Sequence, residues 1–417
     1  MSEIRLLGGR QFNLLERGTV TMSPAASAIY PPSRLYDGTS EWPARFGSLA
    51  VDSFVGVDLD LLRGSGNMDA WSGGLPTGDG WTKTGTVAED TSTKYAGKSS
   101  AKASAGSLTI TKWCRAGEKL RIDCYMRGDG TNAISLTIHN LGTGRFLTPG
   151  LAWSLTNQSY ADTVVGSWAN VAANPTIEGS AACRTDLVQI EITASNGAGN
   201  GWIDELTVVP YVDWCSVHGH NLDPVCVPKL RRAEAQDYSG AVDAATFSVK
   251  RRAFYAFLAA PVAARYWQAP KIVSTVNSAA SGPVWMGEVI LGQSIAVATG
   301  FEFPIETELD RAQVRLLSGS GGETTAAASA AFARRLTLRA IYNGRAAWDA
   351  MTEAIMEATQ NGLYPLALAP EVGGDGDSDS DLVVFGRMAN PVPLRRTQHL
   401  SRSVSLGLRE FPFPLVV

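Results

Sequence analysis

The most constraining feature of this sequence is a regular alternation of apolar and polar residues between residues 64 and 211. In the segment LRIDCYM, Ile122, Cys124 and Met126 fall on one side of an extended chain. The segments ISLTIHN and LVQIEIT show the same period of two. This pattern predicts strands with one buried and one solvated face. Turn-forming clusters such as RGDGTN separate the segments, so we expect a two-layered sandwich or jelly roll.

The sequences on either side of this region also favour strands. Residues 1–63 contain short apolar runs and no helical period, and strand-like sequence returns in 212–285. We interpret 1–63 and 212–285 as one split β-sandwich. Residues 64–211 would be a complete domain inserted into one of its loops. Because insertion needs closely spaced termini, its first and last strands should lie side by side.

Residues 286–417 are expected to form a third domain, a β-sheet or barrel with one covering helix. The segment 344–362 predicts that helix through an apolar stripe and a terminal Asn-Gly. The stripe consists of Trp348, Met351, Ile355 and Ala358. We interpret the Gly/Ser/Ala/Thr-rich segment 311–332 as a long loop, and such loops are usually functional or disordered. The expected fold is therefore mainly β and multidomain.

Composition excludes several classes of function. Apolar residues make up 45% of the 417 residues, which is enough for packed cores. The formal net charge of −4 gives no support for nucleic-acid binding. We expect neither a membrane span nor a secretory signal, and therefore folding in a reducing cytoplasm. Five cysteines without regular spacing predict buried thiols. They are Cys114, Cys124, Cys183, Cys215 and Cys226.

Short motifs for catalysis and metal binding fail on inspection. The GKS of residues 97–99 lacks the earlier glycine of a phosphate loop, and the acidic run 375–381 lacks the glycine and glutamate of a calcium loop. Cys215, His218 and His220 share a segment, but no second cluster supplies further ligands, so we expect strand-end hydrogen bonding there. No nucleophile elbow or compelling carboxylate pair is present, and we do not expect an enzyme.

Several segments of 64–211 resemble carbohydrate-binding modules of the jelly-roll kind found beside xylanases. The matching segments are GNMDAWSGGLPTGDGW, YAGKSSAKAS, AGEKLRIDCYMRG, GSWANVAANPTI and GWIDELTVVP. The resemblance implies a structural calcium ion between the first and last strands, with Asp69 and Asp204 in the corresponding places.

Sugar binding in such modules uses aromatic rings that stack on the pyranose. The resemblance implies Trp113, Tyr125 and Trp153 as the candidate sugar contacts, with Tyr125 and Trp153 exposed. Trp168 is expected in the core. A jelly roll that binds no sugar stays open as the alternative.

The flanking segments resemble distal tail or baseplate proteins of tailed bacteriophages, which carry a galactose-binding-like sandwich. The segments YPPSRLYDGTSEWPARFG, VGVDLDLL and the Gly-His-Asn-Leu of 219–222 carry this resemblance. Residues 286–417 are similar to the tube-forming barrel of phage tails. The resemblance implies a hexameric ring of this chain within a virion tail assembled in the host cytoplasm. The implied partners are tube, hub and tape-measure proteins, with host-surface glycans as ligands.

Two other functions stay open at this point. The first is a polysaccharide-degrading enzyme with an accessory carbohydrate-binding module, which would need a catalytic carboxylate pair in 212–417. The second is a host-binding adhesin or fibre, which should form a trimer rather than a ring.

Overall fold

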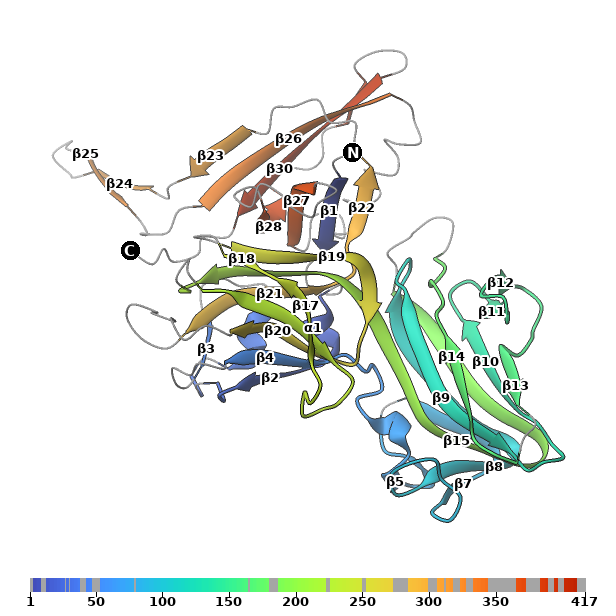
Figure 1. Cartoon of the computed structure of the whole chain (residues 1–417). Coiled ribbons are helices and arrows are strands. Elements are labelled where there is room, and N and C mark those ends of the chain that lie inside the picture. The colour runs from blue at the N-terminus through green and yellow to red at the C-terminus, as the bar shows by residue number, and fades with distance from the viewer. Residues whose placement is uncertain are drawn as a thin grey trace. The chain divides into compact units, whose positions relative to one another are not determined.

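The computed structural model describes most of the 417 residues and confirms the predicted mainly β, multidomain fold (Figure 1). The described residues are 3–8, 13–26, 28–29, 31–37, 43–46, 53–78, 80–163, 166–179, 187–222, 226–249, 253–272, 284–298, 306–310, 313–317, 323–327, 333–343, 365–372, 383–388, 394–396 and 401–410. Among them, no helix has the length and apolar character needed to cross a membrane.

The chain divides into two compact units. One unit, which we call the module, contains residues 58–211 with 263–265. The other, which we call the outer unit, combines 1–57, 212–262 and 266–417. Because the module begins at Asp58, it includes Leu61 and Leu62, which are both buried in its core. The division into three domains expected from the sequence stays a prediction.

The module is one sheet that curls into two layers, because two long strands take part in both. These strands are β8 (Ser100–Arg115) and β15 (Leu187–His220). In the first layer, residues 201–210 of β15 pair with β9 (Leu120–Gly128), which pairs with β14 (Ala169–Ala173). In the second layer, residues 190–195 of β15 pair with β10 (Ile134–Asn140). The register against β8 shifts between Asn196 and Asn200, and such a bulge allows the bend.

Shorter strands complete the two layers. β7 (Trp81–Asp90) pairs with β8 along both, and β13 (Ala161–Thr163) pairs with β10. β11 (Arg145–Leu147) pairs with β10 and with β12 (Trp153–Ser154). Near the start of the module lie the 3-10 turn η2 (Ser65–Asn67) and the small hairpin β5 (Trp71–Ser72) and β6 (Leu75–Pro76).

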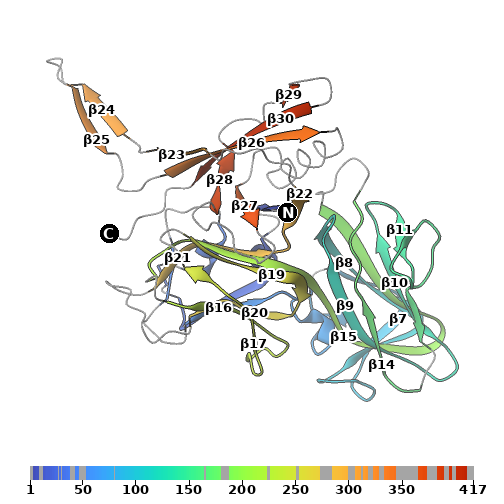
Figure 2. The ribbon, with the colours of Figure 1, turned by 45° about the horizontal axis from the view of Figure 1, so that its top comes forward.

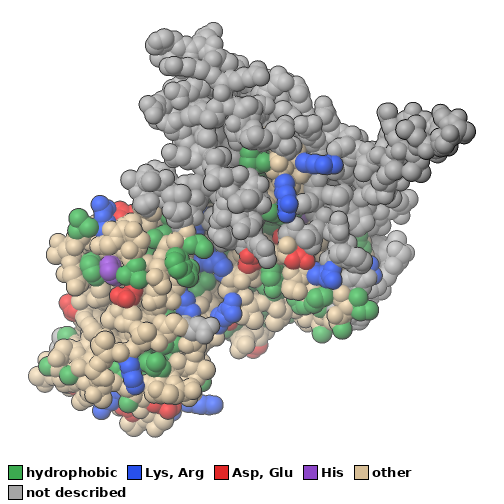
Figure 3. Space-filling model, turned by 180° about the vertical axis from the view of Figure 1, so that it is seen from behind, with side chains coloured by type: hydrophobic (Ala, Val, Ile, Leu, Met, Phe, Trp, Pro, Cys, Tyr) green, Lys and Arg blue, Asp and Glu red, His purple; other side chains and the backbone are tan. Residues whose placement is uncertain are grey.

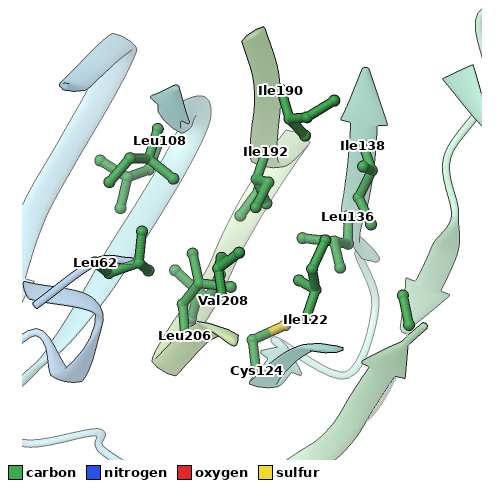
Figure 4. Packing of buried hydrophobic residues seen from close by; sticks show 14 of the residues in the cluster. Leu62, Leu108, Ile122, Cys124, Leu136, Ile138, Ile190, Ile192, Leu206 and Val208 are labelled. Atoms are coloured by element: carbon green, nitrogen blue, oxygen red, sulfur yellow. The ribbon is translucent and has the colours of Figure 1, made fainter. Parts of the chain in front are cut away.

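The inner faces of the two layers form one hydrophobic core (Figure 4). In β9, Ile122, Cys124 and Met126 are fully buried, while the residues between them are half-buried. Leu136 and Ile138 of β10 come from the facing layer and are also fully buried. The alternation predicted from the sequence is therefore confirmed for these strands.

The start of the module is hydrogen-bonded to its last strand. The Leu61 N–H donates to the Val208 carbonyl over 2.9 Å, and the buried Asp60 carboxylate accepts the Val208 N–H over 3.2 Å. The same carboxylate accepts the N–H groups of Leu62 and Gly64. These contacts hold the two ends of the module side by side.

The outer unit contains a five-stranded sheet in the order β17, β16, β20, β4, β2. Their bounds are β17 (Val242–Thr246), β16 (Pro228–Ala233), β20 (Tyr266–Ile272), β4 (Phe54–Asp58) and β2 (Thr19–Ser23). The end of β15 pairs with β21 (Trp285–Gly292), and β21 pairs with β3 (Ala44–Arg45). β18 (Ser248–Val249) and β19 (Ala253–Ala263) extend the β15 sheet, and the 3-10 turn η1 spans Pro32–Leu35.

A second sheet of the outer unit joins the N-terminal strand to the C-terminal part of the chain (Figure 2). Its order is β22 (Ile295–Ala298), β1 (Glu3–Gly8), β27 (Leu366–Val372), β28 (Val384–Met388), β30 (Ser401–Glu410), β26 (Ala333–Asn343) and β23 (Glu306–Asp310), with β29 (Leu394–Arg396) beside β30. β1 therefore pairs with strands from 286–417, although the sequence analysis assigned it to the split sandwich.

Two local expectations for the outer unit are wrong. The short helix α1 (Leu14–Arg17) lies where only strands were expected, because Asn13 caps it and accepts the Leu15 N–H over 3.2 Å. The segment 311–332 contains a hairpin of β24 (Gln313–Leu317) and β25 (Glu323–Ala327) rather than an unstructured loop. Alternating and β-branched residues favour these strands. The helix expected over 344–362 lies outside the described residues.

Four of the five cysteines lie within the described residues, and all four are buried thiols as predicted. Burial raises the pKa of the Cys124 and Cys215 thiols. Cys183 lies outside the described residues.

We expect Gly66→Ala to destabilise the module by about 3 kcal/mol, because a Cβ at Gly66 would overlap the backbone carbonyl of Leu206. The measurement is thermal or urea unfolding followed by tryptophan fluorescence. Gly166→Ala is the matched control, since its Cβ would meet no atom within 4 Å, and its effect should stay within about 0.5 kcal/mol. Equal effects of the two substitutions would contradict the close approach.

Candidate functional site

The three predicted sugar-contact residues do not gather at one site. Trp113 lies on the outer face of the second layer, and Tyr125 lies on the outer face of the first. Trp153 pairs with the buried Leu147 and packs against the core, while its indole N–H donates to the Thr176 carbonyl over 2.9 Å. Trp153 is therefore half-buried rather than exposed, and Tyr125, which was also expected to be exposed, is half-buried under the Tyr95 ring. The module carries two separate outer faces with aromatic residues.

We call the outer face of the second layer the Trp113 face. The Trp113 side chain is 57% exposed, and its residue lies opposite Gln189. Two residues after Gln189 in β15, Glu191 lies opposite His139 of β10. His139 in turn lies opposite Phe146 of β11. The His139 ring stacks on the Phe146 ring at 4.1 Å with an interplanar angle of 5°, and His139 Nδ1 is 3.8 Å from Glu191 Oε1. Figure 3 shows one histidine side chain, in purple, at the surface beside hydrophobic side chains.

Rows of hydroxyl side chains cover the rest of the Trp113 face. One row runs across four strands and consists of Thr82, Thr109, Thr193 and Thr137. The next row consists of Thr84, Ser107, Ser195 and Ser135. The Thr109 and Thr193 hydroxyls are 2.9 Å apart, and the Ser135 and Ser195 hydroxyls are 3.0 Å apart. Hydroxyl groups both donate and accept hydrogen bonds, so this surface can pair with the hydroxyls of a sugar.

We call the outer face of the first layer, with the loop that lies on it, the Tyr95 face. The Tyr95 ring stacks on the Tyr125 ring at 3.4 Å with an angle of 12°, and it meets Trp168 edge-on at 6.1 Å. Hydrogen bonding with Tyr125 raises the pKa of Tyr95. Trp168 is half-buried on this face and not in the core. The expectation for Trp168 was wrong because the residue precedes β14 instead of occupying an inward strand position.

Two carboxylates hold the loop that carries Tyr95. Asp204 is fully buried, and its Oδ2 accepts the N–H groups of Tyr95 and Ala96 over 2.9 and 3.2 Å. Asp69 accepts the N–H groups of Lys98 and Ser99. Burial raises the pKa of Asp204, and the nearby Asp69 charge adds to this effect. The two predicted calcium ligands therefore lie in one region and bind backbone amides there.

The fit of this region to calcium is poor on geometric grounds. The N–H donors point at carboxylate oxygens that a hard cation would need, and calcium prefers six to eight oxygen ligands. Within the described parts of the chain, no three His, Cys, Asp or Glu side chains are grouped as a metal site. Calcium binding by Asp69 and Asp204 stays a prediction.

The two histidines in the described part of the outer unit lie in its interior. His218 and His220 are buried, and His218 Nε2 lies 3.0 Å from the Ser216 hydroxyl. His220 Nδ1 accepts the Leu222 N–H over 3.1 Å, which is the strand-end hydrogen bond predicted from the sequence.

Sequence reasoning missed His139, Phe146, Glu191 and Tyr95. The signal for His139 and Glu191 was present, because the alternation that buries Ile138 and Ile190 turns their neighbours outward. Phe146 and Tyr95 depend on strand register and loop placement, which the sequence pattern does not carry.

Comparison with known proteins finds solved structures that are similar to part of the chain, but no matching sequence family. No family model matches the sequence, and no curated protein matches it. One similar solved structure is the CBM22-1 xylan-binding domain from Paenibacillus barcinonensis Xyn10C, with 14% identity, a TM-score of 0.25, and coverage of 34% of this chain and 89% of that domain. A Family 16 carbohydrate-binding module matches with 8% identity and a TM-score of 0.22, over 29% of this chain and 84% of its own.

A bacteriophage structure is also similar. The enzymatically active domain of bacteriophage CBA120 tailspike protein 4 matches with 14% identity and a TM-score of 0.22. The match covers 31% of this chain and 19% of the tailspike chain. At these scores the likenesses assign no function to the chain.

We expect Asp204→Asn to destabilise the module by about 1–3 kcal/mol, because the amide group would turn a donor toward the N–H groups of Tyr95 and Ala96. Thermal unfolding in EGTA and in excess calcium measures the effect. The exposed Asp162→Asn is the control. If Asp204→Asn loses stability only in excess calcium, the ion binds at this site. If the loss of stability is equal in both buffers, the role of Asp204 is to accept the backbone amides.

Proposed function

We propose that the module binds a carbohydrate through the Trp113 face, and that the chain is a non-enzymatic structural component of a bacteriophage tail. The observation that carries the first part is the exposed Trp113 ring beside hydrogen-bonding side chains on one sheet face. An indole ring offers an apolar plane to the CH-rich side of a pyranose. Glu191, Gln189 and the two hydroxyl rows supply polar groups around it.

The tail assignment draws on sequence segments in the outer unit and on one feature of its fold. The hairpin β24–β25 pairs with no other strand in the described residues, so both of its edges can accept a further strand. A ring requires contact between two different surfaces of one subunit, and an extended hairpin can provide one of them. In this proposal six copies close a ring at the distal end of the tail. They bind tube, hub and tape-measure proteins within the virion.

A ring also explains how weak sugar binding would suffice. Six modules on one ring would engage a host surface together, so that each further contact forms at high effective concentration. The ligand in this proposal is a glycan of the host surface.

We expect Trp113→Ala to weaken glycan binding by roughly tenfold or more and to leave stability unchanged, because the ring is largely solvated. A glycan array with host-envelope polysaccharides, followed by titration calorimetry on any hit, measures the effect. Leu155→Ala removes another exposed apolar side chain, 73% exposed, and should bind like the wild type. Absence of binding to every glycan would reject the carbohydrate function of the Trp113 face.

We expect the purified chain to form rings visible by negative-stain microscopy, with a mass near six subunits by mass photometry. Deletion of 313–327 should yield monomers whose circular dichroism differs from that of the wild type only by the loss of the two hairpin strands. Trimers would favour the adhesin alternative, and a monomeric wild type would reject the ring.

A further inference from the structure

The Tyr95 face carries four cations without a carboxylate partner in the described part of the chain. Lys94 and Lys98 flank Tyr95 in its loop, and both are exposed. Lys94 Nζ donates to the Lys98 carbonyl over 3.0 Å. Lys102 and Arg127 come from β8 and β9 and lie over the Trp202 ring, at 5.6 and 5.5 Å from its centroid.

Two other cations of the module are paired with acids. Arg121 is 2.8 Å from Asp123, and Arg145 is 3.0 Å from Glu178. Arg127 Nε is buried without a hydrogen-bond partner in the described residues, and no carboxylate among them forms an ion pair with this guanidinium. The guanidinium of Arg127 therefore keeps a donor that the protein does not use.

Three acids near the Tyr95 face accept hydrogen bonds from protein donors. Asp69 and Asp204 accept backbone amides beneath the loop, as described above. Asp90 accepts the Trp202 indole N–H over 2.8 Å and the Ser92 N–H over 2.8 Å. Glu205 is half-buried, and burial raises its pKa although the nearby Arg265 charge opposes this. Among the described residues around Tyr95, the four cations therefore outnumber Glu205, whose charge is near enough to raise the pKa of Tyr95.

An aromatic platform lies among these cations. One face of the Tyr95 ring rests on Tyr125, and the residue remains 45% exposed. Trp168 meets this ring edge-on and borders it on one side. Tyr125 and Arg127 are two residues apart on β9, so their side chains leave the sheet on the same face.

From this geometry we propose that the Tyr95 face is a second binding site, specific for an acidic carbohydrate. A pyranose stacks on Tyr95, and its carboxylate or phosphate group pairs with Lys98, Lys102 and Arg127. A guanidinium recognises such planar or multidentate anions through its fork of donors. The site goes beyond the Trp113 face, because it lies on the other layer of the module and uses different strands.

An acidic sugar fits this face better than a single-stranded nucleic acid. Nucleic-acid channels stack successive bases on successive aromatic rings along a charged groove. The Tyr95 face offers one exposed stacked ring with cations around it, which matches a single acidic sugar unit.

The test is titration calorimetry of the full-length chain with trigalacturonic acid, mannose 6-phosphate, neutral galactotriose and an oligothymidylate. We expect at least one acidic sugar to bind, with affinity falling as salt screens the charges. Lys98 is exposed and Lys102 is half-buried, and methionine keeps most of the apolar stem of a lysine, so Lys98→Met and Lys102→Met should preserve the fold and weaken binding by about fivefold each. Tyr95→Ala should weaken it further, while Trp113→Ala and Lys271→Met, in the other unit, should leave it unchanged.

Each alternative result overturns the proposal in a distinct way. Equal binding of galactotriose would remove the charge requirement, and tighter binding of oligothymidylate would make the face a nucleic-acid site. Wild-type affinity in the lysine variants, or no binding of either acidic sugar, would reject the site outright. Loss of binding in Trp113→Ala would place the sugar on the Trp113 face. Comparing the affinity for trigalacturonic acid with that for mannose 6-phosphate shows whether the site recognises a carboxylate or a phosphate group.

Discussion

The backbone hydrogen bonds of β15 are the interaction on which the rest of the structure depends. This one strand pairs with β8, β9 and β10 in the module and then with β21 in the outer unit. Its bulge between Asn196 and Asn200 lets the module curl into two layers around one core. The curl also creates two outer faces, and these display different chemistry: hydroxyl rows with Trp113 on one, and stacked tyrosines with cations on the other.

Much of the module could be predicted from sequence because its strands are buried on one side only. The alternation in β9 fixed which of its residues enter the core, and the same alternation in β10 and β15 turned His139 and Glu191 outward. The outer unit was harder, because the pairing of β1 with β27 joins residues about as far apart as the chain allows, and no local pattern records it. The helix α1 depends on Asn13, whose side-chain amide also donates to the Val289 carbonyl over 2.7 Å, a contact visible only in three dimensions.

The two candidate faces were predictable only in part, because their exposure also depends on strand pairing that no local sequence pattern records. Aromatic residues in a jelly roll suggest sugar contacts, but exposure decides between them, and exposure follows from register. Trp113 stands opposite Gln189 and projects from the sheet, whereas Trp153 stands opposite the buried Leu147 and turns inward. Tyr95 lies in a loop whose position depends on Asp69 and Asp204, more than a hundred residues apart from each other in sequence.

The continuity of β15 has a mechanical consequence for anything held by the module. Tension on a captured ligand would pass into the outer unit along the axis of this strand. Over Trp214–His220 the bonds to β21 lie across that axis, so they would be sheared together instead of opening one after another. A tether built in this way resists pulling through many bonds at once.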